Sequence, residues 1–127
     1  MRILIIDDNK DVTEVVRYYC ESKQIECQTA NSAVDGLALI SNNKFDLVLL
    51  DMAMPEVTGL DVIKHLKLNR LFEGMPIVIF TASSDPKLLY EVARLGVTER
   101  LKKPCGVEEL DRVTSKYRKL SKWLIIL

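Results

Sequence analysis

Short apolar runs alternate with amphipathic segments along the whole chain. Four runs are typical of buried strands, at residues 2–6, 45–50, 77–80 and 97–102, and residues 25–30 alternate between apolar and polar positions as a half-buried strand does. Between these runs, apolar residues recur at intervals of three and four, which predicts helices over residues 11–22, 33–40, 60–69 and 86–95 and from about residue 107. Five strands alternating with five helices predict an α/β fold, a doubly wound parallel sheet with helices on both faces.

Several residues mark where these helices begin and end. Ser32 is typical of a helix N-cap, and Asp85 followed by Pro86 is typical of a cap with proline at the first helical position. Gly96 is placed to end the fourth helix. The same periodicity predicts the side chains that face the sheet: Val12, Val15, Val16, Tyr19 and Cys20, then Val34, Leu37, Ala38 and Ile40, then Val62, Ile63 and Leu66, and lastly Leu88, Leu89, Val92 and Ala93.

The composition indicates one globular domain. The 127 residues are 48% hydrophobic, which suffices for a single core. The 18 basic and 18 acidic residues balance, so the net charge gives no reason to expect direct nucleic-acid or membrane binding. No leader-like or long apolar segment is present, and Cys20, Cys27 and Cys105 lack metal-binding spacing. We therefore expect a cytoplasmic protein with reduced thiols, in which Cys20 and Cys27 are small core residues.

Polar residues follow the ends of four of the predicted strands. In a parallel sheet these ends lie along one edge, where open α/β folds bind their ligands. Each residue also has an ordinary interpretation, as a helix cap, a loop acid, or a surface hydroxyl or lysine. Together, three acids, a hydroxyl and an amine are suited to holding a divalent cation and accepting a phosphoryl group. The residues are Asp7, Asp8, Asp51, Thr81 and Lys103.

Three short motifs carry a resemblance to a known family. Asp51 opens the pattern D-x-x-M-P-x-x-x-G, and the pairs Thr81-Ala82 and Lys103-Pro104 follow it in order. With the paired acids after the first strand, they resemble the receiver domain of two-component response regulators, in particular single-domain chemotaxis regulators. The resemblance covers residues 2–118. It implies the flavodoxin-like receiver fold, with strand order 2-1-3-4-5 and a receiver domain at residues 1–118. The pair Lys103-Pro104 also favours a cis peptide bond.

The resemblance implies what the polar residues do. Asp51 would accept a phosphoryl group from the phosphohistidine of a histidine kinase or phosphotransfer protein, forming an acyl phosphate. Mg²⁺, with Mn²⁺ as an alternative, would be the cofactor. Lys103 and Thr81 would contact the phosphoryl oxygens. The implied metal ligands are Asp7, Asp8, Asp51 and the backbone carbonyl of Ala53.

A protein of this kind would regulate a partner. It would catalyse its own phosphoryl transfer without being an enzyme that has a separate turnover substrate. Phosphorylation would change the loop after Thr81 and the helix at 86–95, and so switch binding to an unidentified downstream protein. Two alternatives remain: a pseudo-receiver that only binds partners, which would lack a site residue, and an aspartyl-nucleophile phosphatase. The second requires an acid where this chain has Ala53.

The chain departs from the family at two positions and near its end. Arg100 stands where many receivers carry an aromatic switch residue, and Cys105 stands where phenylalanine is common. The last helix shows the three- and four-residue intervals of a coiled coil. We expect residues 119–127 to be an apolar extension that makes a homodimer, folds back on the domain or belongs to a longer protein. The repeating positions are Leu110, Val113, Tyr117, Leu120, Leu124 and Leu127.

Overall fold

The computed structural model describes residues 1–71 and 73–126, with side chains described as far as Lys119. In this part of the chain, five strands form one parallel sheet in the order β2-β1-β3-β4-β5, which confirms the expected fold class and strand order. The strands are β1 (Arg2–Ile6), β2 (Glu26–Ala30), β3 (Leu47–Leu50), β4 (Ile77–Thr81) and β5 (Glu99–Lys102).

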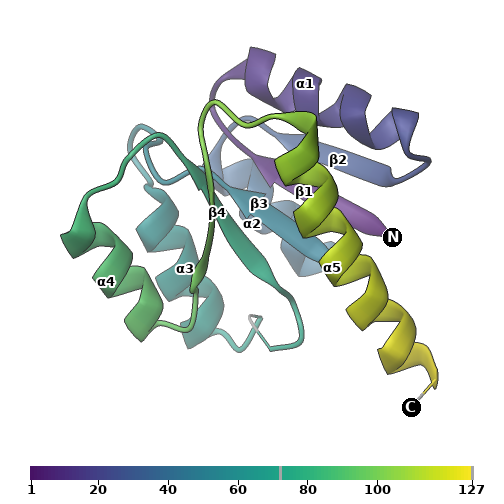
Figure 1. Ribbon diagram of the computed structural model, residues 1–127. Coiled ribbons are helices and arrows are strands. Elements are labelled where there is room, and N and C mark those ends of the chain that lie inside the picture. Colours follow the sequence, from purple (N-terminus) through teal and green to yellow (C-terminus); the bar gives the residue numbers. More distant parts are fainter. Residues whose placement is uncertain (72, 127) are drawn as a thin grey trace.

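A helix follows each strand in the described chain (Figure 1). The side chain of Ser32 accepts the N–H of Asp35 at 3.1 Å, and that of Asp85 accepts the N–H of Lys87 at 3.1 Å, so both predicted caps are confirmed. Gly96 has a φ of 99° just after the fourth helix, as a C′ glycine does. The helices are α1 (Lys10–Ser22), α2 (Ala33–Asn42), α3 (Gly59–Leu68), α4 (Pro86–Arg94) and α5 (Val107–Ile126).

Two apolar layers, one on each face of the sheet, form the core (Figure 1). The α1/α5 layer joins those two helices to alternate strand residues such as Ile3 and Leu49. The α2/α3/α4 layer joins the other three helices to the residues between them, such as Leu4 and Leu50. Successive strand residues point to opposite faces. Because helices cover both faces, the central strands β1, β3 and β4 are apolar except at Arg2 and Thr81 at their ends, which explains why the sequence shows them as nearly unbroken runs.

The predicted inward faces of three helices are wrong at four positions. Val15 and Val34 are 61% and 65% exposed, and Ala38 and Ala93 are also exposed. In α2 the inward position belongs to Gly36, where an added Cβ would lie 2.5 Å from the Cδ1 atom of Ile6. The helix approaches the sheet through this glycine, so Val34 on the neighbouring side of the helix is left facing solvent.

The last helix follows the prediction as far as its side chains are described. Leu110 and Val113 are buried and Tyr117 packs against the α1/α5 layer. The backbone of α5 continues to Ile126, but the side chains that would make the predicted extension or dimer contact, from Leu120 onward, lie outside the described residues. Across the helices that are described, none is both long and apolar enough for a membrane span.

Candidate functional site

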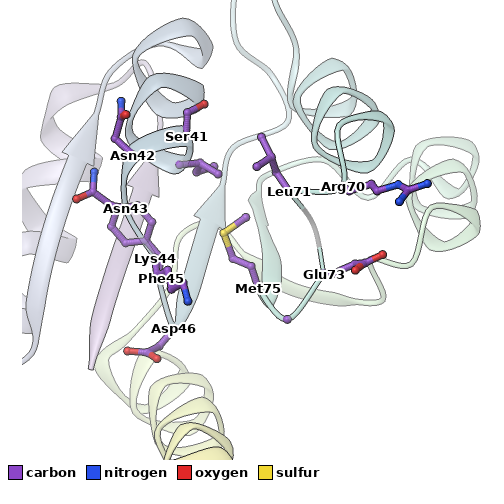
Figure 2. Close-up of a pocket in the computed structure, with 12 residues that line it drawn as sticks. Ser41, Asn42, Asn43, Lys44, Phe45, Asp46, Arg70, Leu71, Glu73 and Met75 are labelled. Carbon is purple, nitrogen blue, oxygen red and sulfur yellow. The ribbon is translucent and has the colours of Figure 1, made fainter.

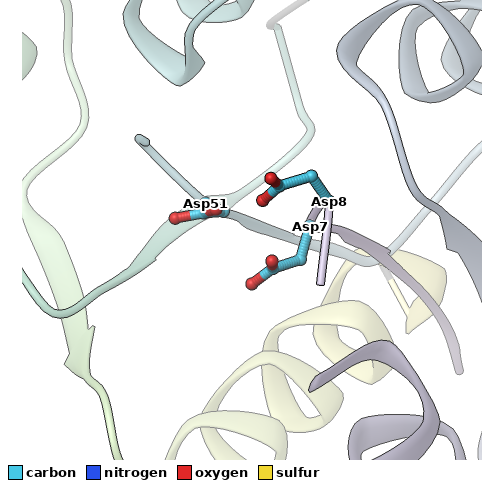
Figure 3. A group of neighbouring side chains, drawn as sticks. All are labelled: Asp7, Asp8 and Asp51. Carbon is cyan, nitrogen blue, oxygen red and sulfur yellow. The ribbon is translucent and has the colours of Figure 1, made fainter. Parts of the chain in front are cut away.

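Three carboxylates meet at the carboxyl edge of the sheet. Asp7 and Asp8 follow β1, and Asp51 follows the neighbouring strand β3. The backbone N–H of Asp51 continues the pairing of these strands by donating to the carbonyl of Ile6 at 2.9 Å. One carboxylate oxygen from each acid lies within 4.8 Å of the others, and Figure 3 shows the three side chains together at the strand ends. The predicted convergence is therefore present.

Lys103 brings a positive charge to this cluster. It follows β5, and its ammonium donates to the carboxylate of Asp7 and lies 3.6 Å from Oδ1 of Asp51. The ammonium also lies 5.2 Å from the centre of the Phe80 ring, at a distance typical of a cation–π contact. The Lys103–Pro104 peptide bond is cis, as the sequence predicted. The ammonium of Lys103 thus lies beside two buried carboxylates, those of Asp7 and Asp51.

Thr81 ends β4 and is buried beside Lys103. The backbone N–H of Lys103 donates to the carbonyl of Thr81 at 3.0 Å. The hydroxyl oxygen of Thr81 accepts the N–H of Ser83 at 3.1 Å. A hydroxyl that accepts one hydrogen bond keeps its own proton free to donate. Thr81 is therefore held by the loop that follows it while it retains a donor for a ligand.

Neighbouring groups that the sequence analysis missed hold the acids in place. The backbone N–H of Asn9 donates to the carboxylate of Asp7 at 2.9 Å, and the Asn9 side chain caps α1. The side-chain amide of Asn31 donates to the carbonyl of Asp7 at 3.0 Å. Both asparagines directly follow a strand or precede a helix, so the turn chemistry of asparagine was the signal that could have identified them.

The loop from β3 to α3 brings the Asp51 backbone close to a helix start. The N–H of Ala53 donates to Oδ1 of Asp51 at 3.2 Å. An added Cβ at Gly59 would lie 2.5 Å from the Asp51 carbonyl, so only glycine fits at the end of this motif. A capping box between Thr58 and Asp61 then begins α3. The predicted ligand role of the Ala53 carbonyl stays a prediction.

The cluster carries an excess of negative charge. When all are ionised, three carboxylates face one ammonium, and Asp7 is fully buried. Burial raises the pKa of Asp51 above its ordinary value of 3.8, and the charges of Asp7 and Asp8 add to the rise. The Ala53 N–H and the Lys103 ammonium act in the opposite direction. Clustered carboxylate oxygens are the donors that a hard divalent cation prefers, so this set of residues fits Mg²⁺.

The opposite edge of the sheet offers a contrasting pocket of about 670 Å³. Figure 2 shows that its lining comes from the end of α2, from the segment before β3 and from the turn before β4. Its charged side chains are of mixed sign: Lys44, Asp46, Arg70 and Glu73. Among the residues that the structure describes, the only group of three or more potential metal ligands is the acidic cluster, so we place the candidate site there.

Comparisons with known proteins agree with this geometry. Residues 3–115 match the family model described as the response regulator receiver domain. The chain is 32% identical over 108 residues to the response regulator SaeR of Staphylococcus aureus strain USA300, which covers 85% of this chain and 46% of the relative. The chain thus spans about half the length of the curated relatives it matches.

Solved structures with the same fold extend over most of the chain. The Vibrio cholerae chemotaxis protein CheY4 superposes with a TM-score of 0.84 at 25% identity, covering 91% of this chain and 97% of its own. A response regulator receiver domain protein from Clostridium thermocellum gives a TM-score of 0.84 at 28% identity, covering 97% and 98%.

Proposed function

This chain belongs to the response regulator receiver domain family, a regulatory family and not one of conventional enzymes, and we propose that it is the phosphoacceptor of a two-component phosphorelay. Asp51 accepts the phosphoryl group from the phosphohistidine of a histidine kinase or a phosphotransfer protein. The observation that supports this role is the convergence of Asp51 with Asp7, Asp8 and Lys103 at one edge of the sheet.

The chemistry assigns the central step to Asp51. A carboxylate oxygen attacks phosphorus, the bond from phosphorus to the histidine nitrogen breaks, and the imidazole leaves with that electron pair. The product is an acyl phosphate. Attack requires the ionised carboxylate, whereas burial favours the protonated one in the ion-free protein. The Ala53 N–H at 3.2 Å and the ammonium of Lys103 at 3.6 Å both stabilise the ionised form.

The residues that would hold the cofactor are Asp7, Asp8, Asp51 and the backbone carbonyl of Ala53. Mg²⁺, or Mn²⁺ in its place, supplies positive charge that offsets the carboxylates and the phosphoryl oxygens when bound. Lys103 contributes a second positive charge beside Asp7 and Asp51. Its ammonium contacts Asp7 in the present state and pairs with a phosphoryl oxygen in the phosphorylated one. The Thr81 hydroxyl donates its free proton to another phosphoryl oxygen.

A chain of hydrogen bonds would carry the change to the surface. Thr81 accepts from the N–H of Ser83, and the carbonyl of Ser83 accepts from the guanidinium of Arg100 at 3.1 Å. Movement of Thr81 towards the phosphoryl group shifts the loop after β4, to which Arg100 is hydrogen-bonded through the carbonyl of Ser83. Arg100 therefore acts as a charged reporter at the position where many receivers have an aromatic residue. The surface that switches is the loop after β4 together with α4.

A mass measurement tests the proposal. The wild-type protein, given acetyl phosphate and Mg²⁺, should gain the mass of one phosphoryl group, and hydroxylamine should remove it because acyl phosphates are labile to this nucleophile. Asp51→Asn should gain nothing. Asp11→Asn is the matched control, since Asp11 is an exposed acid at the start of α1 outside the cluster, and it should label like the wild type. A wild-type protein that stays unlabelled while remaining folded would make the chain a pseudo-receiver.

A further inference from the structure

Two of the three cysteines face each other between α1 and β2. Cys20 lies in the last part of α1 and is completely buried in the α1/α5 layer. Cys27 lies in β2, is half-buried and packs against the same layer. In the sheet, Cys27 pairs with Ile3, and parallel partners point to the same face. Because Ile3 belongs to the α1/α5 layer, the thiol of Cys27 points towards α1.

The backbone holds Cys20 beside the start of β2. Its carbonyl accepts the N–H of Lys23 at 3.1 Å and that of Ile25 at 2.8 Å. Ile25 precedes Cys27 by two positions, so their side chains leave the extended chain on the same side. The two thiols are within hydrogen-bond reach of each other, and this contact lowers the pKa for the first proton lost from the pair and raises the pKa for the second. A short turn therefore places two free thiols against each other.

We propose that Cys20 and Cys27 form a reversible intramolecular disulfide by exchange with a small-molecule disulfide. The half-buried Cys27 on the edge strand β2 is the thiol that meets the reagent. Its thiolate attacks one sulfur of the reagent, and a mixed disulfide forms as the first small thiolate leaves. The Cys20 thiolate then attacks the sulfur of Cys27 and expels the second small thiolate. The two protons of the protein thiols end on the two small thiols, and the reagent is reduced.

Cys105 serves as the internal reference. It lies in the segment between β5 and α5, and its thiol donates to the carbonyl of Gly106 at 3.4 Å, much as the Cys27 thiol donates to the carbonyl of Gln28 at 3.7 Å. It is half-buried, as Cys27 is. If exposure alone governed reactivity, Cys27 and Cys105 would react alike. Proximity to a second thiol distinguishes Cys27, and only Cys27 can pass from a mixed to an internal disulfide.

Oxidised glutathione is the reagent for the test. The folded, fully reduced protein is incubated with it, quenched in acid, unfolded and treated with a thiol alkylator. We expect Cys105 to be the one thiol that stays outside the internal bond. Apart from the group added to Cys105, the mass of the protein should fall by two hydrogen atoms. Trypsin cleaves after Lys23, between the two cysteines, so the disulfide should join residues 18–23 to residues 24–44. A stable mixed disulfide on Cys27, or the alkylation of all three thiols, would overturn the proposal.

Variants separate the two steps. Cys20→Ser should trap glutathione on Cys27, because the resolving thiol is missing. Cys105→Ser is the matched control and should form the internal disulfide as the wild type does. Oxidised Cys105→Ser should also unfold at a higher urea concentration than its reduced form, since the bond restricts the unfolded chain. Because buried Cys20→Ser can be unstable, the wild-type mass and the oxidised-versus-reduced urea comparison stand without it. A lower urea midpoint after oxidation would contradict a bond that fits the native structure.

Discussion

The apolar layers on the faces of the sheet and the acidic cluster at its carboxyl edge are built on opposite principles. In the layers, buried apolar side chains from helices and strands contact each other and charge is absent. At the edge, three carboxylates lie within 4.8 Å of one another with one lysine between two of them. The cluster nonetheless forms hydrogen bonds, since no buried side-chain nitrogen or oxygen of the described residues lacks a partner.

This contrast separates stability from function. Burial in the layers stabilises the fold without any ligand. Like charges in the cluster oppose folding, and a cation or a phosphoryl group bound there changes that balance. Cavities made in the layers should therefore lower the free energy of unfolding whether or not Mg²⁺ is present. Changes of charge in the cluster should instead alter the free energy of unfolding and its dependence on Mg²⁺. The following measurements probe the two regions separately.

The largest effect is expected in the layers. Leu49 in β3 is 1% exposed, and Leu49→Ala should lower the free energy of unfolding by about 3 kcal/mol because it leaves a cavity. Leu68→Ala is the matched control, since Leu68 ends α3 and is 84% exposed; it should change stability by less than about 0.5 kcal/mol. Urea denaturation without Mg²⁺ measures both. Equal losses would mean that the layers are not the source of stability.

Mg²⁺ should have the next largest effect, through the cluster. At a free concentration a hundredfold above its Kd, it should raise the free energy of unfolding of the wild type by about 2.7 kcal/mol. Asp8→Asn removes an exposed carboxylate of the cluster and should reduce this gain, whereas Asp11→Asn should keep it. Thermal denaturation over a Mg²⁺ titration measures the gain. If Asp8→Asn gained as much as the wild type, the cation would bind elsewhere.

A smaller stabilisation is expected when the buried charge is removed. Without Mg²⁺, Asp51→Asn should raise the free energy of unfolding by about 1 kcal/mol at neutral pH, because the amide carries no charge and can still accept from Ala53. Asp35→Asn, an exposed acid in the first turn of α2, is the control and should not stabilise. Destabilisation by Asp51→Asn would show that Lys103 already compensates the charge.

The same variant gives the sign of the pH dependence. Asp51 binds its proton more tightly in the folded protein than in the unfolded chain, because burial raises its folded pKa above 3.8. Its contribution to stability is then fully present below about pH 4 and is lost as the pH rises through the raised value. The advantage of Asp51→Asn over the wild type should therefore grow with pH in this window. Urea midpoints at several pH values measure it.

The smallest effect on stability is expected at Arg100. Arg100→Ala removes one partly exposed hydrogen bond to Ser83 and should cost less than about 1 kcal/mol. Labelling of Asp51 by acetyl phosphate should be unchanged. The change in the amide spectrum of α4 on adding a phosphoryl mimic should shrink, whereas Arg94→Ala on the exposed side of α4 should leave it intact. An undiminished α4 response would remove Arg100 from the switch.

Much of the fold followed from local signals. Ser32, Asp85 and Gly96 marked helix ends because caps and left-handed residues depend on the backbone of a single turn. The predicted inward faces were wrong at Val15, Val34, Ala38 and Ala93. A 3.6-residue period defines an apolar stripe about as wide as the helix contact, and only the partner surface decides which border of the stripe is covered.

The candidate site was predictable for a related reason. Strand ends are visible in the sequence, and a parallel sheet aligns them at one edge, so the five polar residues could be grouped before any contact was known. The supporting groups were not predictable in this way. Asn31 and Phe80 act through a backbone carbonyl and a ring face, at distances set by neighbouring strands and not by spacing along the chain.

By itself, the order of apolar and polar residues determined the elements, the layers and the edge at which chemistry could occur, because each of these depends on periods of two or 3.6 residues. The tertiary structure alone decided that one ammonium lies between Asp7 and Asp51, and that the thiols of Cys20 and Cys27 meet. Such contacts depend on how far apart packed elements lie, and that distance is set by all the side chains between them.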